Sequence, residues 1–260
     1  MLQSGVAMFG PHHFRNKRKR NMLRLPRLVK PATLILCPLL LSAGIALAAP
    51  ETPASAQDMA RCGSNIPDTA IAGCTALLQA GERTPTAWAG IYQRRAIAYY
   101  NKGLADEAIA DETEVITLKP DFGPAYYDRA EAYLKSDRTD EAIADYTKAI
   151  SLRPHYAEAY SDRGVAYGKK GLTDQGLADE TEAITMKPSL AEAYVNRSGF
   201  YMKKGLTDQA IADCTRAILL EPDYARPYYE RGLAKRAKGD TAGADADIAR
   251  ARQLNPGIAK

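Results

Sequence analysis

Apolar and small side chains recur along this chain with the spacing of paired amphipathic helices. Residues 191–222 read AEAYVNRSGFYMKKGLTDQAIADCTRAILLEP, and each half of this stretch places tyrosine, small or aliphatic side chains three or four positions apart. That spacing brings the side chains onto one helical face. The central glycine is typical of a helix end, and the final proline cannot continue a helix interior. The stretch therefore predicts a helix, a tight turn and a second helix.

The same pattern starts again every 34 residues and occurs five times between residue 89 and the C-terminus. We number the repeat so that its proline stands at position 32. Position 4 is then always tyrosine, position 8 is always small, and position 20 is alanine or glycine. Self-similarity at such a period indicates stacked structural units, each of which buries its apolar face against its neighbours.

The steps Tyr-x-x-Arg-small-x-x-Tyr, Gly-x(4)-Ala and Ala-x(4)-Pro resemble the tetratricopeptide repeat (TPR) family. The resemblance implies an all-α solenoid of about five helix-turn-helix repeats, wound into a right-handed superhelix with a concave groove. The expected repeats span residues 89–122, 123–156, 157–190, 191–224 and 225–258. The last repeat is expected to cap the array, because Asp245 and Arg252 replace apolar residues that face the next repeat in the other copies.

Residues 58–84 match the second half of the repeat and are interpreted as an N-terminal capping half-repeat with a shortened first helix. Cys62 and Cys74 flank its turn. In an exported chain, two cysteines this close predict a disulfide. The alternative is a pair of buried free thiols.

Residues 1–48 have the pattern of a secretory signal peptide. Eight basic residues and no acidic ones precede or enter an apolar run over residues 32–48, which ends in the small-x-small sequence Ala46-Leu47-Ala48. Residues 49–57 are expected to form a linker, and cleavage after Ala48 or Ala56 is expected to release a periplasmic or secreted protein. The alternative is an uncleaved leader that anchors the chain in the membrane.

The leader also affects the charge argument. Translation can begin at Met1, Met8 or Met22. Removal of the leader from the full sequence changes the formal net charge of the chain from +4 to −4. A mildly acidic chain has no basic stripe that would neutralise phosphates, so no nucleic-acid partner is expected.

Two charged positions recur in every repeat. Because the first helix of a TPR packs against the second helices of its own and the preceding repeat, we interpret these charges as a ladder of ion pairs between helices. The alternative is a charged stripe that binds a ligand. Position 7 holds Arg95, Arg129, Arg163, Arg197 and Arg231, and position 23 holds Asp111, Asp145, Asp179, Asp213 and Asp247.

Catalytic constellations are missing from the sequence that follows the leader. His155 is the one histidine there, and a single histidine cannot make a metal cluster. A Ser-His-Asp or Cys-His set could be assembled only around this residue. The carboxylates near Glu112 and Glu180 repeat with the period, and we interpret them as a solvated helix face. These two glutamates nevertheless stand at position 24, which is apolar in the family. The sequence predicts no cofactor, no metal and no enzymatic activity.

The expected function is that of a monomeric, non-catalytic scaffold that binds a peptide or helix of a partner protein in the concave groove. In TPR proteins the groove is lined by positions 2, 5, 9 and 12 of the first helix. Position 5 and position 9 lack the Lys and Asn that clamp a C-terminal carboxylate in some family members. The alternative function is a recognition subunit of a cell-envelope enzyme complex. The expected groove residues are Gln93, Tyr100, Tyr127, Glu131, Leu134, Val165, Val195, Met202, Arg226, Tyr229 and Leu233.

Overall fold

A computed structural model describes residues 56–81 and 84–258, and these fold into twelve α-helices. The expected leader, and nearly all of the expected linker, lie outside the described residues. The helices are α1 (Ala56–Cys62), α2 (Pro67–Gln79), α3 (Pro85–Lys102), α4 (Ala105–Leu118), α5 (Gly123–Lys135), α6 (Thr139–Leu152), α7 (Ala157–Lys169), α8 (Thr173–Met186), α9 (Ala191–Lys203), α10 (Thr207–Leu220), α11 (Ala225–Ala237) and α12 (Thr241–Leu254).

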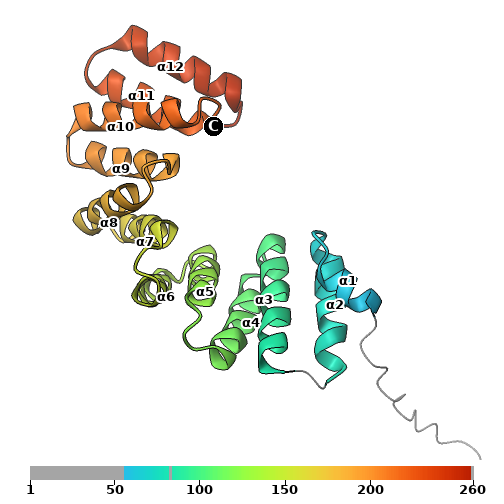
Figure 1. Ribbon diagram of the computed structural model, residues 1–260. Helices are drawn as coiled ribbons and strands as arrows, with labels where there is room; N and C mark the ends of the chain where they lie inside the picture. The colour runs from blue at the N-terminus through green and yellow to red at the C-terminus, as the bar shows by residue number, and fades with distance from the viewer. Residues whose placement is uncertain (1–55, 82–83, 259–260) are drawn as a thin grey trace, which may run out of the picture. The chain divides into compact units, whose positions relative to one another are not determined.

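Consecutive helices pack in antiparallel pairs that follow one another in chain order (Figure 1). The pairs from α3/α4 to α11/α12 correspond to the five repeats, and each second helix also packs against the first helix of the next pair. Some first helices of successive pairs also touch each other directly, as α7 touches α9 and α9 touches α11. The architecture is the all-α TPR solenoid that the repeat predicts. Within the described part of the chain, no helix is both long and apolar enough to cross a bilayer.

Short turns inside each pair need a residue in the left-handed backbone region. Gly103 has a φ of 80° at the end of α3, and glycines serve the same purpose in three later pairs. In the α5/α6 pair this place is taken by Asp137, with a φ of 57°. Aspartate tolerates this region better than most residues that carry a Cβ.

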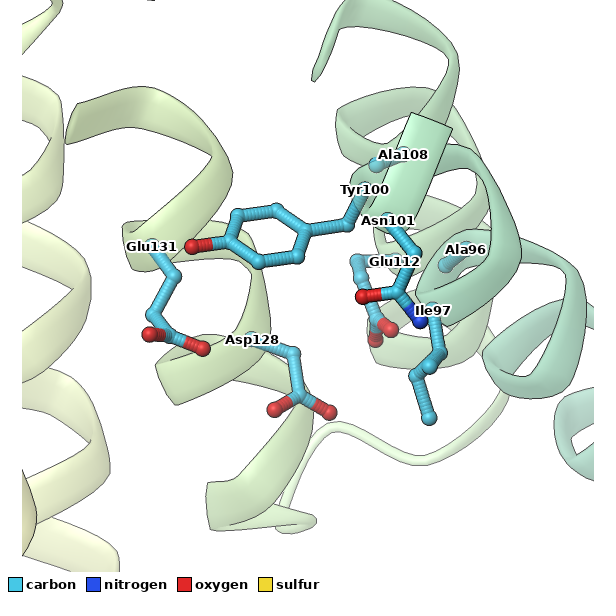
Figure 2. A pocket seen from close by; sticks show the side chains of 8 residues that line it. All are labelled: Ala96, Ile97, Tyr100, Asn101, Ala108, Glu112, Asp128 and Glu131. Carbon is cyan, nitrogen blue, oxygen red and sulfur yellow. The ribbon is translucent and has the colours of Figure 1, made fainter. Parts of the chain in front are cut away.

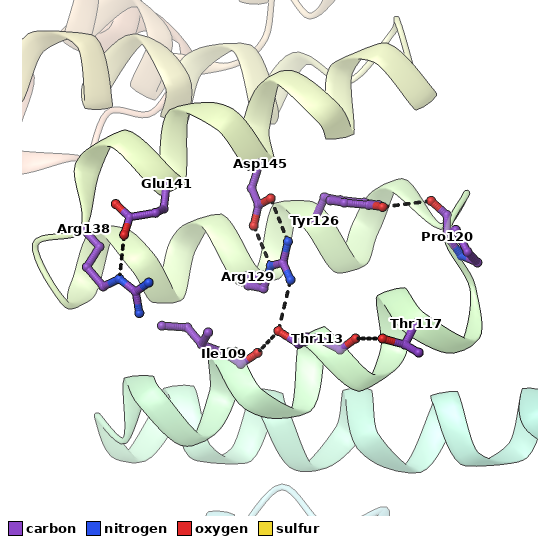
Figure 3. Close-up of polar contacts among 9 residues, drawn as sticks. All are labelled: Ile109, Thr113, Thr117, Pro120, Tyr126, Arg129, Arg138, Glu141 and Asp145. Carbon is purple, nitrogen blue, oxygen red and sulfur yellow. Dashed lines mark hydrogen bonds and ion pairs between the residues drawn. The ribbon is translucent and has the colours of Figure 1, made fainter. Parts of the chain in front are cut away.

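The predicted arginines and aspartates form ion pairs between the two helices of each repeat, and each arginine also reaches the preceding repeat (Figure 3). Arg129 on α5 donates from Nε and Nη2 to the two carboxylate oxygens of Asp145 on α6, at 2.7 and 2.9 Å. Its Nη1 donates to the hydroxyl of Thr113 on α4 at 3.0 Å. One guanidinium thus joins three helices. The other rungs are Arg95–Asp111 with Thr75, Arg163–Asp179 with Thr147, Arg197–Asp213 with Thr181, and Arg231–Asp247 with Thr215.

Tyrosines flank the ladder arginines on both sides in the first four repeats, and on one side at Arg231. The Arg129 guanidinium lies 5.8 Å from the ring centroids of both Tyr126 and Tyr133, which stand one turn before and after it. The Tyr126 hydroxyl donates to the carbonyl of Pro120 at 3.1 Å. The recurring tyrosines therefore shield the rung from water and also fix the loop between repeats.

The N-terminal pair α1/α2 replaces this rung by a covalent link. Cys62 and Cys74 are joined by a disulfide with a Cα–Cα distance of 4.6 Å, as the sequence analysis expects. Gly73 stands where the other second helices carry the ladder aspartate. A Cβ at this glycine would lie 2.5 Å from the Cβ of Arg61 and the amide nitrogen of Cys62. The missing side chain allows α1 to approach α2 closely enough for the disulfide.

Candidate functional site

The first helices of the pairs carry the expected groove residues, and most of these side chains are partly exposed. Gln93 and Tyr100 lie on α3, and Val165 lies on α7. Val195 on α9 differs, because it is only 1% exposed and packs against Tyr194 and Ala217 in the core. It is not accessible to a ligand. Of the other expected residues, the half-buried ones are Tyr127, Glu131, Leu134, Met202 and Tyr229, and the exposed ones are Arg226 and Leu233.

Tyr127 is held by contacts within the protein. Its ring packs against those of Tyr146 and Tyr156, with centroids 5.6 and 4.9 Å away, and its hydroxyl donates to Asp162 at 2.5 Å. Burial raises the pKa of Asp162 to about 6. Burial, followed by the nearby carboxylates Asp162 and Asp128, raises the pKa of Glu131 to about 7. The middle of this face is therefore aromatic and acidic.

A cavity of about 270 Å³ opens beside this region, between α3, α4 and α5 (Figure 2). The carboxyl groups of Glu112, Asp128 and Glu131 and the hydroxyl of Tyr100 point into the same space. The remaining lining residues are Ala96, Ile97, Asn101 and Ala108.

Glu112 is the most unusual side chain of the cavity. It is 1% exposed, and neither of its carboxyl oxygens has a hydrogen-bond partner. Burial, followed by repulsion from Asp128 and Asp111, raises its pKa to about 9. Asp128 is also largely withdrawn from water, which raises its pKa, and it accepts a hydrogen bond from Gln93 Nε2 at 3.3 Å.

The expectation that Glu112 and Glu180 belong to a solvated helix face is wrong. Both are buried, at 1% and 0% exposure, because position 24 of the second helix faces the core of its repeat. The sequence contained the signal, since a glutamate at an apolar position needs an explanation. The acidic residues Asp128 and Asp162 at position 6 were missed, because position 6 is not among those expected to line the groove. Among the described residues, no group of three or more His, Cys, Asp or Glu side chains is arranged to hold a metal ion.

Comparison with known proteins identifies the repeats. Family models described as "TPR repeat" and "Tetratricopeptide repeat" match residues 135–171 and 191–224. No curated protein shows significant sequence similarity to the chain.

Solved structures with the same fold include MamA (residues 41 to the end) from Desulfovibrio magneticus RS-1, at a TM-score of 0.58 and 18% identity over 66% of this chain and 98% of that one. YrrB, described as a TPR protein with an unusual peptide-binding site, has a TM-score of 0.53 and 18% identity over 65% of this chain and 87% of that one. PilF of Pseudomonas aeruginosa has a TM-score of 0.61 and 14% identity over 66% of this chain and 79% of that one. At these identities the likeness concerns the fold. The two matched repeats and the helix pairs described above agree with it, and the described residues have the fold of a tetratricopeptide repeat protein.

Proposed function

We propose that the face formed by α3, α5, α7, α9 and α11 binds an extended or helical segment of a partner protein. The observation that carries the proposal is the alignment of half-buried tyrosines and apolar side chains on successive first helices. Tyr100, Met202 and Tyr229 belong to this set, and large aromatic and aliphatic side chains of this kind are typical anchors of protein interfaces. YrrB, which has a similar fold, is described as having a peptide-binding site, in line with this proposal.

The proposed setting is the cell envelope, where the protein acts as a non-catalytic scaffold after export. The leader-like sequence of residues 1–48 supports export. The disulfide between Cys62 and Cys74 supports an oxidising compartment, in which such bonds persist. Mass spectrometry of the protein purified from cells tests this proposal. We expect a mature N-terminus after Ala48 or Ala56, whereas an intact leader on protein from the cytoplasmic fraction would contradict export.

Capture of partners from an envelope extract tests the binding face. The variant Met202→Ala/Tyr229→Ala removes two side chains of the face, and we expect it to lose the partner that the wild-type protein retains. Tyr127 is left intact, because its contacts with Tyr146 and Asp162 make it important for folding. Circular dichroism checks that the helical content is unchanged.

The matched control is Leu219→Ala on α10, which removes an apolar side chain that is 69% exposed on a second helix. We expect this variant to capture the partner as well as the wild-type protein does. If the wild-type protein, Met202→Ala/Tyr229→Ala and Leu219→Ala all captured the partner equally, or if only Leu219→Ala lost it, the binding surface would lie elsewhere.

A further inference from the structure

We propose that the cavity between α3, α4 and α5 binds the cationic side chain of a lysine or arginine in the partner segment. This inference rests on the proposed function and specifies which side chain of the partner it recognises. The cavity opens beside Tyr100 and Glu131, two of the residues expected to line the binding face. A ligand side chain lying along the first helices can therefore enter it.

A comparison inside the molecule shows that Glu112 is arranged differently from its counterpart two repeats later. Glu180 stands at the same repeat position and is equally buried, but it accepts a hydrogen bond from the Ser161 hydroxyl at 2.7 Å. Asn196 of the next repeat also interacts with its carboxyl group. For Glu112, the equivalent of that asparagine is Asp128, which repels a carboxylate. Glu180 therefore has a partner for one of its two carboxyl oxygens, whereas both carboxyl oxygens of Glu112 lack a partner from the protein itself.

The space next to Glu112 is also open, whereas the cavity at the equivalent place of the third repeat, of about 230 Å³, does not reach Glu180. There the ring of Phe200 from α9 packs so closely on Gly176 that a Cβ at this glycine would lie 2.3 Å from it. The residue of α5 equivalent to Phe200 is Ala132, whose smaller side chain is buried in a cluster with Ala108 and does not cover Glu112. The cavity of about 270 Å³ beside Glu112 far exceeds the roughly 30 Å³ that one water molecule occupies. It is large enough for the end of a long side chain.

The charges of the cavity favour an organic cation. Its lining contains three carboxyl groups and neither lysine nor arginine. The nearby cations are already engaged, because Lys135 donates to the backbone carbonyl of Tyr100 and Arg129 belongs to the ladder. The Tyr100 ring borders the cavity, and one of its faces already carries the Lys135 ammonium group, 4.2 Å from the ring centroid. Among the described residues, no group of three or more His, Cys, Asp or Glu side chains is arranged to hold a metal ion, which favours an organic cation over a metal ion.

Entry of a cation also changes the protonation of Glu112. Its carboxyl group is protonated at neutral pH in the empty cavity, because burial raises its pKa to about 9. The groups that face it are Asp111 on α4, together with Asp128, Arg129 and Glu131 on α5 and Tyr100 on α3. A bound ammonium or guanidinium group stabilises the carboxylate, so the proton leaves to the solvent. Binding is therefore expected to strengthen as the pH rises towards about 9, because the complex holds fewer protons than the free protein.

Nuclear magnetic resonance on protein with labelled alanine methyl groups tests the proposal. Ala96 and Ala108 line the cavity and report on its occupation. The probes are the Nα-acetyl methylamides of lysine, of arginine and of norleucine, which is a neutral analogue of lysine. We expect saturable shifts of both methyl signals with the lysine or arginine probe and none with norleucine. Calorimetry in buffers of different ionisation enthalpy is expected to show proton release.

The variant Glu112→Gln keeps the shape of the protonated side chain and removes its ability to ionise. We expect it to weaken binding of the cationic probe by about tenfold or more, as loss of a charge-assisted contact does. It should also reduce the proton release, a readout that a merely structural role would not affect; the remaining release comes from Glu131, whose pKa is raised to about 7. The matched control Glu180→Gln alters the hydrogen-bonded counterpart and should leave both readouts unchanged.

Equal shifts with the norleucine probe, or unchanged binding and proton release in Glu112→Gln, would overturn the cation site. That result leaves the proposed binding face intact if Met202→Ala/Tyr229→Ala still abolishes capture of the partner. Conversely, cationic probes that bind at the cavity while this double variant retains the partner would reject the binding face alone.

Discussion

At the scale of single residues, a small set of repeat positions makes the same contacts from one repeat to the next. The Arg129 side chain is 16% exposed and that of Asp145 is 11% exposed, so this pair is largely removed from water. Loss of one partner leaves an uncompensated charge in a poorly solvated place, which costs more than the intact pair contributes. The ladder therefore fixes how the helices align as well as adding stability.

We predict that Asp145→Ala and Arg129→Ala each lower the free energy of unfolding by about 2 kcal/mol, and that their effects are not additive by about 1 kcal/mol or more. Urea denaturation of both single variants and the double variant measures this coupling. The control is Asp140→Ala, which breaks the ion pair with Lys170 on the surface, where the Asp140 side chain is 76% exposed. Its expected cost is about 0.5 kcal/mol. Strict additivity of the two ladder variants would contradict the role assigned to the rung.

The two buried glutamates make the stability dependent on pH. Burial raises the pKa of Glu112 and of Glu180 from 4.5 to about 9, so the folded protein holds protons that the unfolded chain releases. The stability that comes with these protons is complete below about pH 4.5 and is lost as the pH rises through about 9. Each group contributes a slope of up to about 1.4 kcal/mol per pH unit in this window.

We predict that Glu112→Gln/Glu180→Gln flattens this decline, because an amide does not titrate. Denaturant midpoints measured across the window, for the variant and the wild-type protein, provide the test. Curves that run parallel over the whole range would show that these carboxyl groups ionise in the folded protein as they do in the unfolded chain.

At the scale of elements, the α1/α2 pair shows how a shortened repeat is held in place. Helix α1 has 7 residues, too few to form a stable helix alone. It depends on the disulfide between Cys62 and Cys74 and on its close approach to Gly73. The pair therefore forms an N-terminal cap that is stabilised by its own disulfide and by the close packing of its two helices.

We predict that Gly73→Ala destabilises this cap by about 1 to 3 kcal/mol, because the added methyl group overlaps with α1. The control is Gly90→Ala on α3, where a Cβ would meet no atom within 4 Å. This second change is expected to stabilise the protein by about 0.5 to 1 kcal/mol, since alanine favours the helix. Hydrogen exchange should be faster in α1 and α2 of Gly73→Ala only. Equal protection of α1 in both variants would contradict the packing described for Gly73.

The helix pairs and the ladder could be predicted from the sequence because their determinants repeat. Each repeat shows independently which type of residue a position requires, and position 7 is arginine in all five repeats. The threonine at position 25 that joins each rung to the next repeat was equally regular but was not noticed, since a threonine on a helix surface needs no partner. The cavity could not be predicted, because it depends on a departure from the pattern at Glu112, whose consequence appears only when the helices pack.

At the scale of the whole array, the last repeat differs from the others in the surface that it presents. Asp245 is paired with Arg236 at 2.5 Å, where earlier repeats carry an aliphatic residue that packs on the next one. The ladder threonine is likewise replaced by Ala249. These changes support the interpretation of α11 and α12 as a capping repeat.

We predict that Asp245→Ile/Arg252→Ile promotes self-association, because it restores the apolar surface to which another repeat could dock. Sedimentation velocity at increasing protein concentration measures the effect. The control Asp223→Ile/Arg250→Ile replaces another pair of opposite charges, one in the loop before α11 and one on α12, which lie 3.8 Å apart, and should remain a monomer. A test variant that stays monomeric at every concentration would contradict the assignment of the cap.

The central claim is that a partner segment lies along the first helices of the array, and photo-crosslinking in living cells tests it most directly. A photoreactive phenylalanine analogue replaces Tyr229 on α11 in one strain and Leu219 on α10 in another. The account predicts a discrete crosslinked product from residue 229 and none from residue 219. A product from residue 219 alone, the same products from both residues, or none from either would contradict it.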